Sequence, residues 1–222
     1  MRFAGVGAII VLAVSTSFAQ APAKAATYIT KEQVDAVNAT PGVDRTLQIW
    51  DLGKVQFSVG VIHRGPTAAP ARGAANAGAA RGAAAGAQAT GARGAADPCG
   101  ERTEGTAPAG GFAGAISHDF QTEGYLIISG SGTLVTGGHI NNGTKSAAES
   151  DVTKVLNGPS CSGAASGNDI VRKVVKTGDI IIIPAGVPHG WTEISDHVDY
   201  LSFRPMTEKL LVPNYVNPNM PK

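Results

Sequence analysis

Hydrophobic and polar residues alternate along this chain in short runs, which is typical of β-strands rather than helices. In the clearest run, residues 55–63, every second position is apolar: Val55, Phe57, Val59 and Val61. His63 has the same parity, so we expect its side chain to point inward with them. Further short strands are expected at 46–50, 115–117, 125–128, 132–136, 170–175 and within 193–204. The pattern therefore predicts an all-β sandwich or barrel.

One short helix is expected before the first strand. Thr30 and Gln33 have the spacing of a capping box, which predicts a helix over 31–38.

Residues 178–189 carry the strongest local signal. The four consecutive isoleucines at 180–183 favour a strand buried on both faces, and a proline and a glycine then turn the chain. His189 follows the turn and alternates with Trp191 and Glu193, so the three are expected on one face of the next strand. Such a turn places a histidine at the mouth of an apolar β-structure, where a metal or ligand site can form.

Two long segments differ in composition from the expected strands. Residues 65–111 consist mainly of alanine, glycine, arginine and proline, and they cannot bury enough apolar surface to offset the entropy of ordering. We predict that they form a disordered surface insertion. Residues 137–168 are expected to be a polar connection with a helical turn around 147–155. The expected organisation is, in order, a signal segment 1–19, the first barrel strands within 20–64, the insertion, a barrel core 112–205 and an extended tail 206–222.

The first 19 residues have the features of an export signal. Arg2 supplies a positive end, an apolar run follows, and Ser17 and Ala19 are the small residues that precede a cleavage site. The apolar run is too short for a stable membrane anchor. We therefore expect an exported protein, periplasmic or secreted, without membrane contact once the signal is removed.

The charge balance limits the classes of partner. The 18 Lys and Arg against 17 Asp and Glu give a net charge of +1, which argues against a nucleic-acid or anionic-membrane partner because both need a basic surface. A small-molecule ligand or substrate is expected instead.

Cys99 and Cys161 are the two cysteines, and in an exported chain they are candidates for a disulfide. Both lie among glycine, proline and serine, so a bridge would join two loops rather than brace the core. The sequence alone leaves their pairing open.

The side chains that could ligate a metal are His63, His118, His139, His189, Glu123 and Glu193. His118 ends one expected strand and Glu123 begins the next, so a hairpin would bring them together. With His189 they form a set of two imidazoles and one carboxylate, which suits divalent iron, manganese, nickel or zinc and leaves coordination positions open. Spacing alone does not separate this set from structural histidines beside a solvated glutamate.

Two stretches resemble the conserved motifs of the cupin superfamily. Residues 118–130 (H-x4-E-x6-G) are similar to the first motif without its leading part. Residues 178–193 (G-x5-P-x-G-x2-H-x3-E) are similar to the second, with glutamate where asparagine is usual. The resemblance covers about residues 112–204. It implies a double-stranded β-helix, the jelly-roll barrel, with a metal held by His118, Glu123 and His189.

The chain departs from the cupin pattern at Ile116, which stands where the first motif normally has a further histidine. Three alternatives follow. The site has three protein ligands and more open positions, or His63 replaces the missing ligand, or the barrel has lost its metal and binds a small organic molecule.

Other residues near the motifs have two interpretations each. Glu193 either accepts a hydrogen bond that orients His189 or points to solvent at the barrel mouth. Trp191, Tyr125 and Phe203 either line a pocket or belong to the core.

The resemblance implies an enzyme or a binding protein without choosing between them. The first hypothesis is an exported metal-dependent dioxygenase, isomerase or lyase that acts on a small organic acid or carbonyl compound. The second is a non-catalytic barrel that binds a small molecule or sugar, and a weaker third is a structural role. Pairing into a homodimer is expected by analogy with cupins only.

Overall fold

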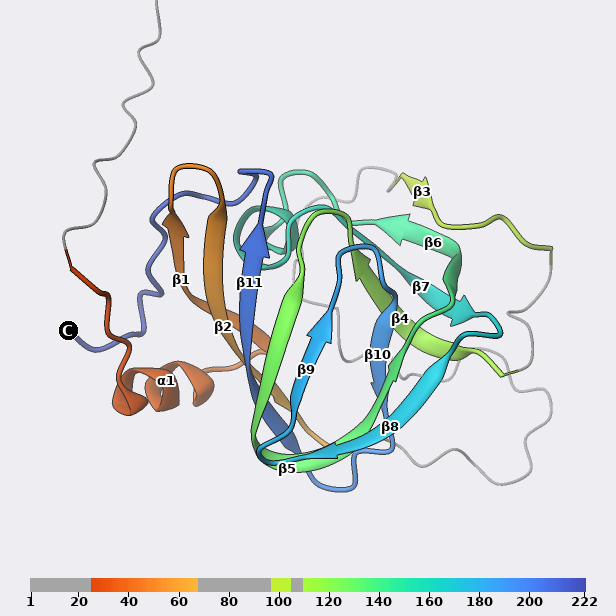
Figure 1. Ribbon diagram of the computed structural model, residues 1–222, viewed down its shortest axis with the longest axis horizontal. Helices are drawn as coiled ribbons and strands as arrows, with labels where there is room; N and C mark the ends of the chain where they lie inside the picture. Colours follow the sequence, from red (N-terminus) through yellow and green to blue (C-terminus); the bar gives the residue numbers. More distant parts are fainter. Residues whose placement is uncertain (1–24, 68–96, 105–109) are drawn as a thin grey trace, which may run out of the picture.

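The computed structural model describes residues 25–67, 97–104 and 110–222, which form two facing layers of antiparallel strands (Figure 1). The expected all-β jelly roll is confirmed. The elements in chain order are α1 (Lys31–Asn38), β1 (Asp44–Asp51), β2 (Gln56–Arg64), β3 (Pro98–Cys99), β4 (Phe112–His118), β5 (Glu123–Thr136), β6 (His139–Lys145), the π-helix η1 (Val152–Leu156), β7 (Ser160–Ser166), β8 (Val171–Lys176), β9 (Ile180–Ile183), β10 (His189–Thr192) and β11 (Val198–Met206).

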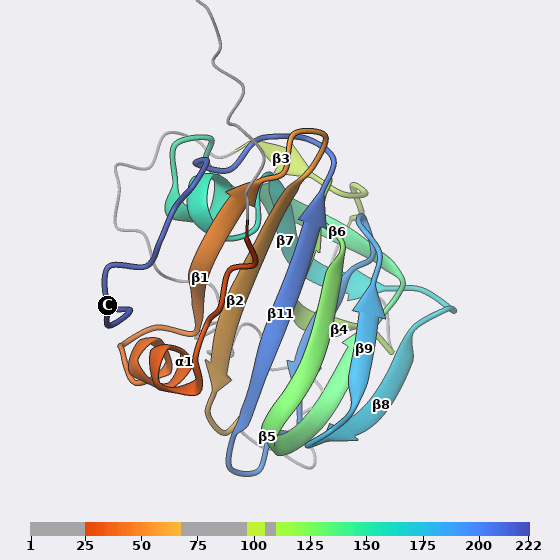
Figure 2. The ribbon, with the colours of Figure 1, turned by 60° about the vertical axis from the view of Figure 1, so that its left-hand side comes forward.

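The long strand β5 connects the two layers. Its first half pairs with β11 and β9, which continues the order β1-β2-β11-β5-β9. Its second half pairs with β8 on one side and with β10 on the other, which leads to the order β10-β4-β7-β6-β3. Figure 2 shows β5 running through both layers. We expected two strands here, at 125–128 and 132–136, but the structure has one.

Gly130 lies at the centre of β5 and explains why a single strand can serve both layers. Its φ is +70°, and a Cβ atom at this position would lie 2.0 Å from the carbonyl oxygen of His197. Only glycine fits both the backbone conformation and the close approach.

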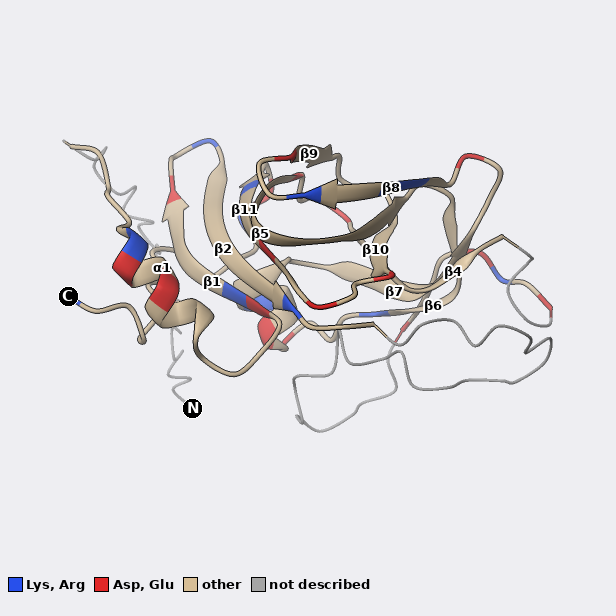
Figure 3. Cartoon of the chain, turned by 90° about the horizontal axis from the view of Figure 1, so that it is seen from below, with Lys and Arg blue, Asp and Glu red and all other residues tan. Residues whose placement is uncertain are grey.

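The interior between the layers holds an apolar cluster, and charged residues of both signs are spread over the two layers (Figure 3). The buried side chains of this cluster are Ile62, Tyr125, Ile127, Leu134, Val175, Ile183, Trp191, Ile194, Val198 and Tyr200. Among the described residues, no helix has the length and apolar character needed to span a membrane.

The outward face of β2 is also buried, because α1 covers it. Val37 of α1 packs against Leu47, Val59 and Val61, whereas Ile62 belongs to the interior. The strand was predicted correctly, but its alternating apolar side chains face the helix and not the barrel interior. His63 follows the outward parity, so the expectation that it points inward is wrong.

The polar stretch 137–168 contains two strands that the sequence pattern did not indicate. The small residues of β6 and β7 allow close packing, since a Cβ atom on Gly143 would lie 2.7 Å from Cys161 Sγ, and one on Gly163 would lie 2.8 Å from Ile140 Cγ2. The expected helical turn is present as η1.

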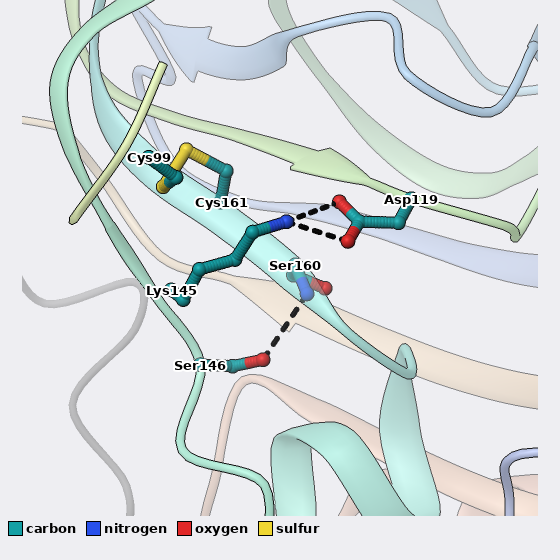
Figure 4. Close-up of a disulfide and its surroundings, with 6 residues drawn as sticks. All are labelled: Cys99, Asp119, Lys145, Ser146, Ser160 and Cys161. Carbon is teal, nitrogen blue, oxygen red and sulfur yellow. Dashed lines mark hydrogen bonds and ion pairs between the residues drawn. A yellow bond between two sulfur atoms is a disulfide. The ribbon is translucent and has the colours of Figure 1, made fainter. Parts of the chain in front are cut away.

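Cys99 and Cys161 form a disulfide with a Cα–Cα distance of 6.0 Å (Figure 4). The bridge links β3 to β7 across β6, which lies between them. Cys161 is buried in an apolar cluster with Phe112, Val135, Ile140 and Ala165. The bridge therefore joins strands and braces a core, and the expectation of a link between loops is wrong.

Strand β3 lies inside the segment 65–111 for which we predicted disorder, and it pairs with β6. The prediction is therefore wrong for this short part. Residues 68–96 and 105–109, and the expected export signal, lie outside the described residues.

The isoleucine strand β9 is confirmed as a strand but is not buried on both faces. It pairs only with β5, and Ile180 and Ile182 are 72% and 64% exposed, while Ile183 is buried. The reason is its place at the edge of its layer, far along the sheet from the strands that α1 covers.

Candidate metal centre

Three side chains meet inside the barrel, each from the end of a strand. His118 ends β4, Glu123 begins β5, and His189 begins β10, which lies between the other two strands. The turn that holds Gly186 donates its N–H to the carbonyl oxygen of His118 at 2.7 Å, so the two motif regions are hydrogen-bonded to each other. The side chains of His118, Glu123 and His189 are only 3%, 2% and 5% exposed. This is the group of potential metal ligands found among the described residues.

The turn between His118 and Glu123 is anchored from a neighbouring strand. Asp119, directly after His118, forms an ion pair with Lys145 of β6 at 2.5 Å (Figure 4). Its backbone N–H donates to the carbonyl oxygen of Pro159. These contacts hold the end of β4, and with it His118, in position.

The ligand atoms of the three side chains all lie within 4.8 Å of one another, and the two separations from Glu123 fit one divalent ion. Glu123 Oε2 lies 3.2 Å from His118 Nε2 and 3.1 Å from His189 Nε2. Bonds of about 2.1 Å at neighbouring coordination positions separate ligand atoms by about 3.0–3.4 Å. The observed distances therefore match neighbouring ligands on a single ion.

Hydrogen bonds on the far side of each ring orient both histidines. His189 Nδ1 lies 3.0 Å from the carbonyl oxygen of Val187, which can only accept, so Nδ1 carries the proton. His118 Nδ1 lies 2.9 Å from Ser160 Oγ, and Ser160 donates its own proton to the carbonyl of Gly158. Nε2 of each ring faces Glu123 Oε2, and in the neutral form of the ring its lone pair is available to a cation placed between them.

The protonation states agree with this geometry. Burial lowers the pKa of His118, more than the neighbouring carboxylate raises it, so the ring is neutral near pH 7. Burial alone would raise the pKa of Glu123, but His118, His189 and Arg204 outweigh it and hold that pKa well below its usual value. A neutral imidazole and an ionised carboxylate are the forms that bind metals.

Glu123 is held by three further side chains. Tyr125 donates its hydroxyl to Oε2 at 2.7 Å, while Ser202 Oγ and Arg204 Nε donate to Oε1 at 3.0 and 3.1 Å. Burial, reinforced by the charge of Glu123, raises the pKa of Tyr125 well above its usual value, so the phenol remains a donor. Tyr125 was expected as a pocket wall or core residue, and it contacts the ligand set directly.

Sequence reasoning missed Ser160, Ser202 and Arg204. Ser202 and Arg204 alternate with Tyr200 on the inward face of β11 and are fully buried. The signal that was available is that Arg204 has the parity of core residues. Phe203, expected in a pocket or in the core, is partly exposed on the outward face of β11, so neither expectation is met.

Several predicted residues lie away from the centre. His63 is 47% exposed, with Nδ1 2.6 Å from Asp199, so it does not replace the missing ligand. Glu193 is exposed and accepts a hydrogen bond from Thr133, so it does not orient His189. His139 faces Glu101 at the surface. Trp191 is a core residue, with its ring 5.4 Å from that of Tyr200.

Ile116, which stands where the first cupin motif normally has a further histidine, pairs with His189 on the neighbouring strand. Within the described parts of the chain, no fourth histidine, cysteine or carboxylate joins the group.

Comparison with known proteins gives only distant likenesses. No family model matches the chain, and no curated protein matches it. Similar solved structures include an oxalate oxidase in complex with glycolate, with 12% identity over 77% of this chain and 54% of that chain, at a TM-score of 0.31. Peruvianin-I, a cysteine peptidase from Thevetia peruviana latex, has 9% identity over 84% and 82%, at 0.33. The capsular polysaccharide assembling protein CapF from Staphylococcus aureus has 14% identity over 80% and 31%, at 0.29.

The chain spans about half the length of the oxalate oxidase chain that it matches. Likenesses at these scores carry no weight for function, which rests on the residues of the site.

Proposed function

We propose that this chain, a cupin in its fold and motifs, binds one divalent transition metal through His118, Glu123 and His189. Iron, manganese, nickel and zinc all suit two imidazoles and a carboxylate. The observation that carries the proposal is the convergence of two oriented Nε2 atoms on one carboxylate oxygen, at 3.1 and 3.2 Å, in a buried site.

We further propose that the protein is an exported metal-dependent enzyme of dioxygenase, isomerase or lyase type. Three protein ligands leave coordination positions for a small organic acid or carbonyl compound, and a bound metal would polarise its oxygen atoms. The protein side chains exclude bulk water by their burial, keep both rings oriented, and hold a proton on Tyr125 directly beside Glu123. Export and pairing into a homodimer remain predictions.

A second candidate is a non-catalytic barrel that captures a small molecule or sugar. Ile116 favours it, because an apolar side chain takes the place of a ligand next to His189. The two functions differ in turnover. An enzyme would consume a candidate 1,2-dicarbonyl compound or dioxygen in a metal-dependent reaction, whereas a binder would show only ligand-induced stabilisation.

Metal analysis of protein purified without chelator tests the site. We expect close to one transition-metal ion per chain in the wild type and loss of that metal in His118→Ala/His189→Ala. The matched control is His63→Ala/His139→Ala, which also removes two histidines but leaves the site intact, and should keep its metal. A folded wild-type protein that stays metal-free on soaking would contradict the proposal.

A further inference from the structure

Arg204 is a cation buried next to the proposed metal ligand. Its side chain is 1% exposed, and it lies between two carboxylates, with Nε 3.1 Å from Glu123 Oε1 and Nη2 2.7 Å from Asp44 Oδ2. A guanidinium is not deprotonated in proteins, so Arg204 is charged here. Arg204 therefore offsets part of the negative charge that Glu123 offers to a metal.

The fold makes room for this guanidinium at one position. Gly60 of β2 faces it, and a Cβ atom there would lie 3.1–3.4 Å from three of its atoms. An alanine there would shift the guanidinium by a few tenths of an ångström, and a larger side chain would take up its space. Arg204 is thus seated by the backbone of β2 as well as by its ion pairs.

The two carboxylate oxygens of Glu123 have different partners. Oε1 accepts from Ser202 and Arg204, and Arg204 Nε also contacts Ser202 Oγ at 2.9 Å, so the three groups form a closed network. Oε2 faces His118 and His189. With both of its good acceptor directions used, Oε1 has none left for a metal.

We propose that Arg204 is a positioning residue that holds Glu123 to one-oxygen coordination and so keeps an additional metal position open for a small molecule. This inference rests on the proposed metal site. Without Arg204, Glu123 could turn both oxygens to the metal and fill that position itself.

Cobalt(II) serves as the probe, because its ligand-field absorption reports the number and geometry of its ligands. The infrared difference between cobalt-loaded and metal-free protein reports how the carboxylate binds, through the separation of its two stretching bands. The test variant is Arg204→Met/Asp44→Asn, which removes a positive and a negative charge together. The control is Asp44→Asn alone, which leaves Arg204 on Glu123.

We expect one-oxygen bands in the wild type and in Asp44→Asn, and two-oxygen bands with an altered cobalt spectrum in the double variant. Cobalt affinity, measured by chelator competition, should rise about 10-fold or more in the double variant because a nearby cation no longer repels the metal. If the double variant fails to fold, Gly60→Val places further side-chain atoms in the space of the guanidinium without changing any charge. Its matched control is Gly65→Val, where a Cβ atom meets nothing within 4 Å.

The outcomes separate the two proposals. A wild type that takes up no cobalt overturns the metal site, and this inference with it. A wild type that binds cobalt but has the same bands and spectrum as the double variant, or as Gly60→Val where that variant replaces it, overturns only the role of Arg204. The same change in Asp44→Asn alone would also overturn it, since Arg204 is then retained.

Discussion

Ser160 of β7 accepts a hydrogen bond from His118 Nδ1 at 2.9 Å, and its replacement by alanine should weaken metal binding without touching a ligand. The side chain is fully buried, so water cannot take its place without rearrangement. Alanine would leave the His118 N–H unpaired and free the ring to rotate or to change tautomer. The backbone N–H of Ser160 would keep its bond to Ser146 Oγ, so the strand itself should persist (Figure 4).

The size of the effect follows from the cost of an unpaired buried donor. That cost is about 1–3 kcal/mol, which corresponds to about 5- to 150-fold in an equilibrium constant. Loss of a group that orients a ligating histidine typically weakens metal affinity by about 10- to 100-fold. We therefore expect Ser160→Ala to raise the dissociation constant for zinc or cobalt by about 10- to 100-fold.

The measurement is competition for the metal against a chelator of known affinity, at fixed pH and ionic strength. Ser162→Ala is the matched control, because it makes the same change two residues along β7 at an exposed position. It should bind metal as the wild type does. An affinity of Ser160→Ala within about threefold of the wild type, in a folded protein, would refute the claim that this hydrogen bond orients His118.

Two further predictions concern the disulfide and the missing ligand. The bridged cysteines, Cys99 and Cys161, are 62 residues apart in the sequence. A Cys99→Ser/Cys161→Ser variant should therefore lose about 4 kcal/mol of unfolding free energy, measured by urea titration. A loss under about 1 kcal/mol would contradict this. Ile116→His should supply a fourth ligand beside His189, tighten metal binding by about 10-fold or more in chelator competition, and change the cobalt spectrum. Unchanged affinity and spectrum would mean that position 116 does not face the metal.

The ligand set was predicted from the resemblance of two stretches to the cupin motifs, because spacing alone did not separate it from structural histidines. The structure shows that these motif residues lie at strand ends. A five-residue step from His118 to Glu123 spans one turn, and the proline-glycine turn before His189 begins a strand that lies beside both. The geometry of these turns depends little on the residues that pack in other parts of the barrel. The residues that hold the ligands, Ser160 and Arg204, come from strands distant in sequence, so no spacing rule indicated them.

Parity errors have a common physical cause. Alternation shows that one face of a strand is buried but not what buries it. In β2 the apolar face meets α1, and the barrel face carries Ser58 and Gly60; a Cβ atom on Gly60 would crowd the guanidinium of Arg204. On β11 the inward face likewise carries polar residues, Ser202 and Arg204, whereas Phe203 lies on the outward face. β6 and β7 were missed because close packing there requires glycine and serine, which read as a loop.

Ile116 and Arg204 act on the metal site in the same direction. Ile116 offers no donor atom where a histidine was expected, and Arg204 occupies the second oxygen of Glu123. Each reduces the number of ligands that the protein supplies, and together they leave three donor atoms for an ion that commonly takes more. A structural metal site is stabilised by a complete set of protein ligands. A site that binds a small molecule through the metal needs vacant coordination positions. The pattern of residues around Glu123 therefore favours a centre completed by an external ligand over a closed structural site.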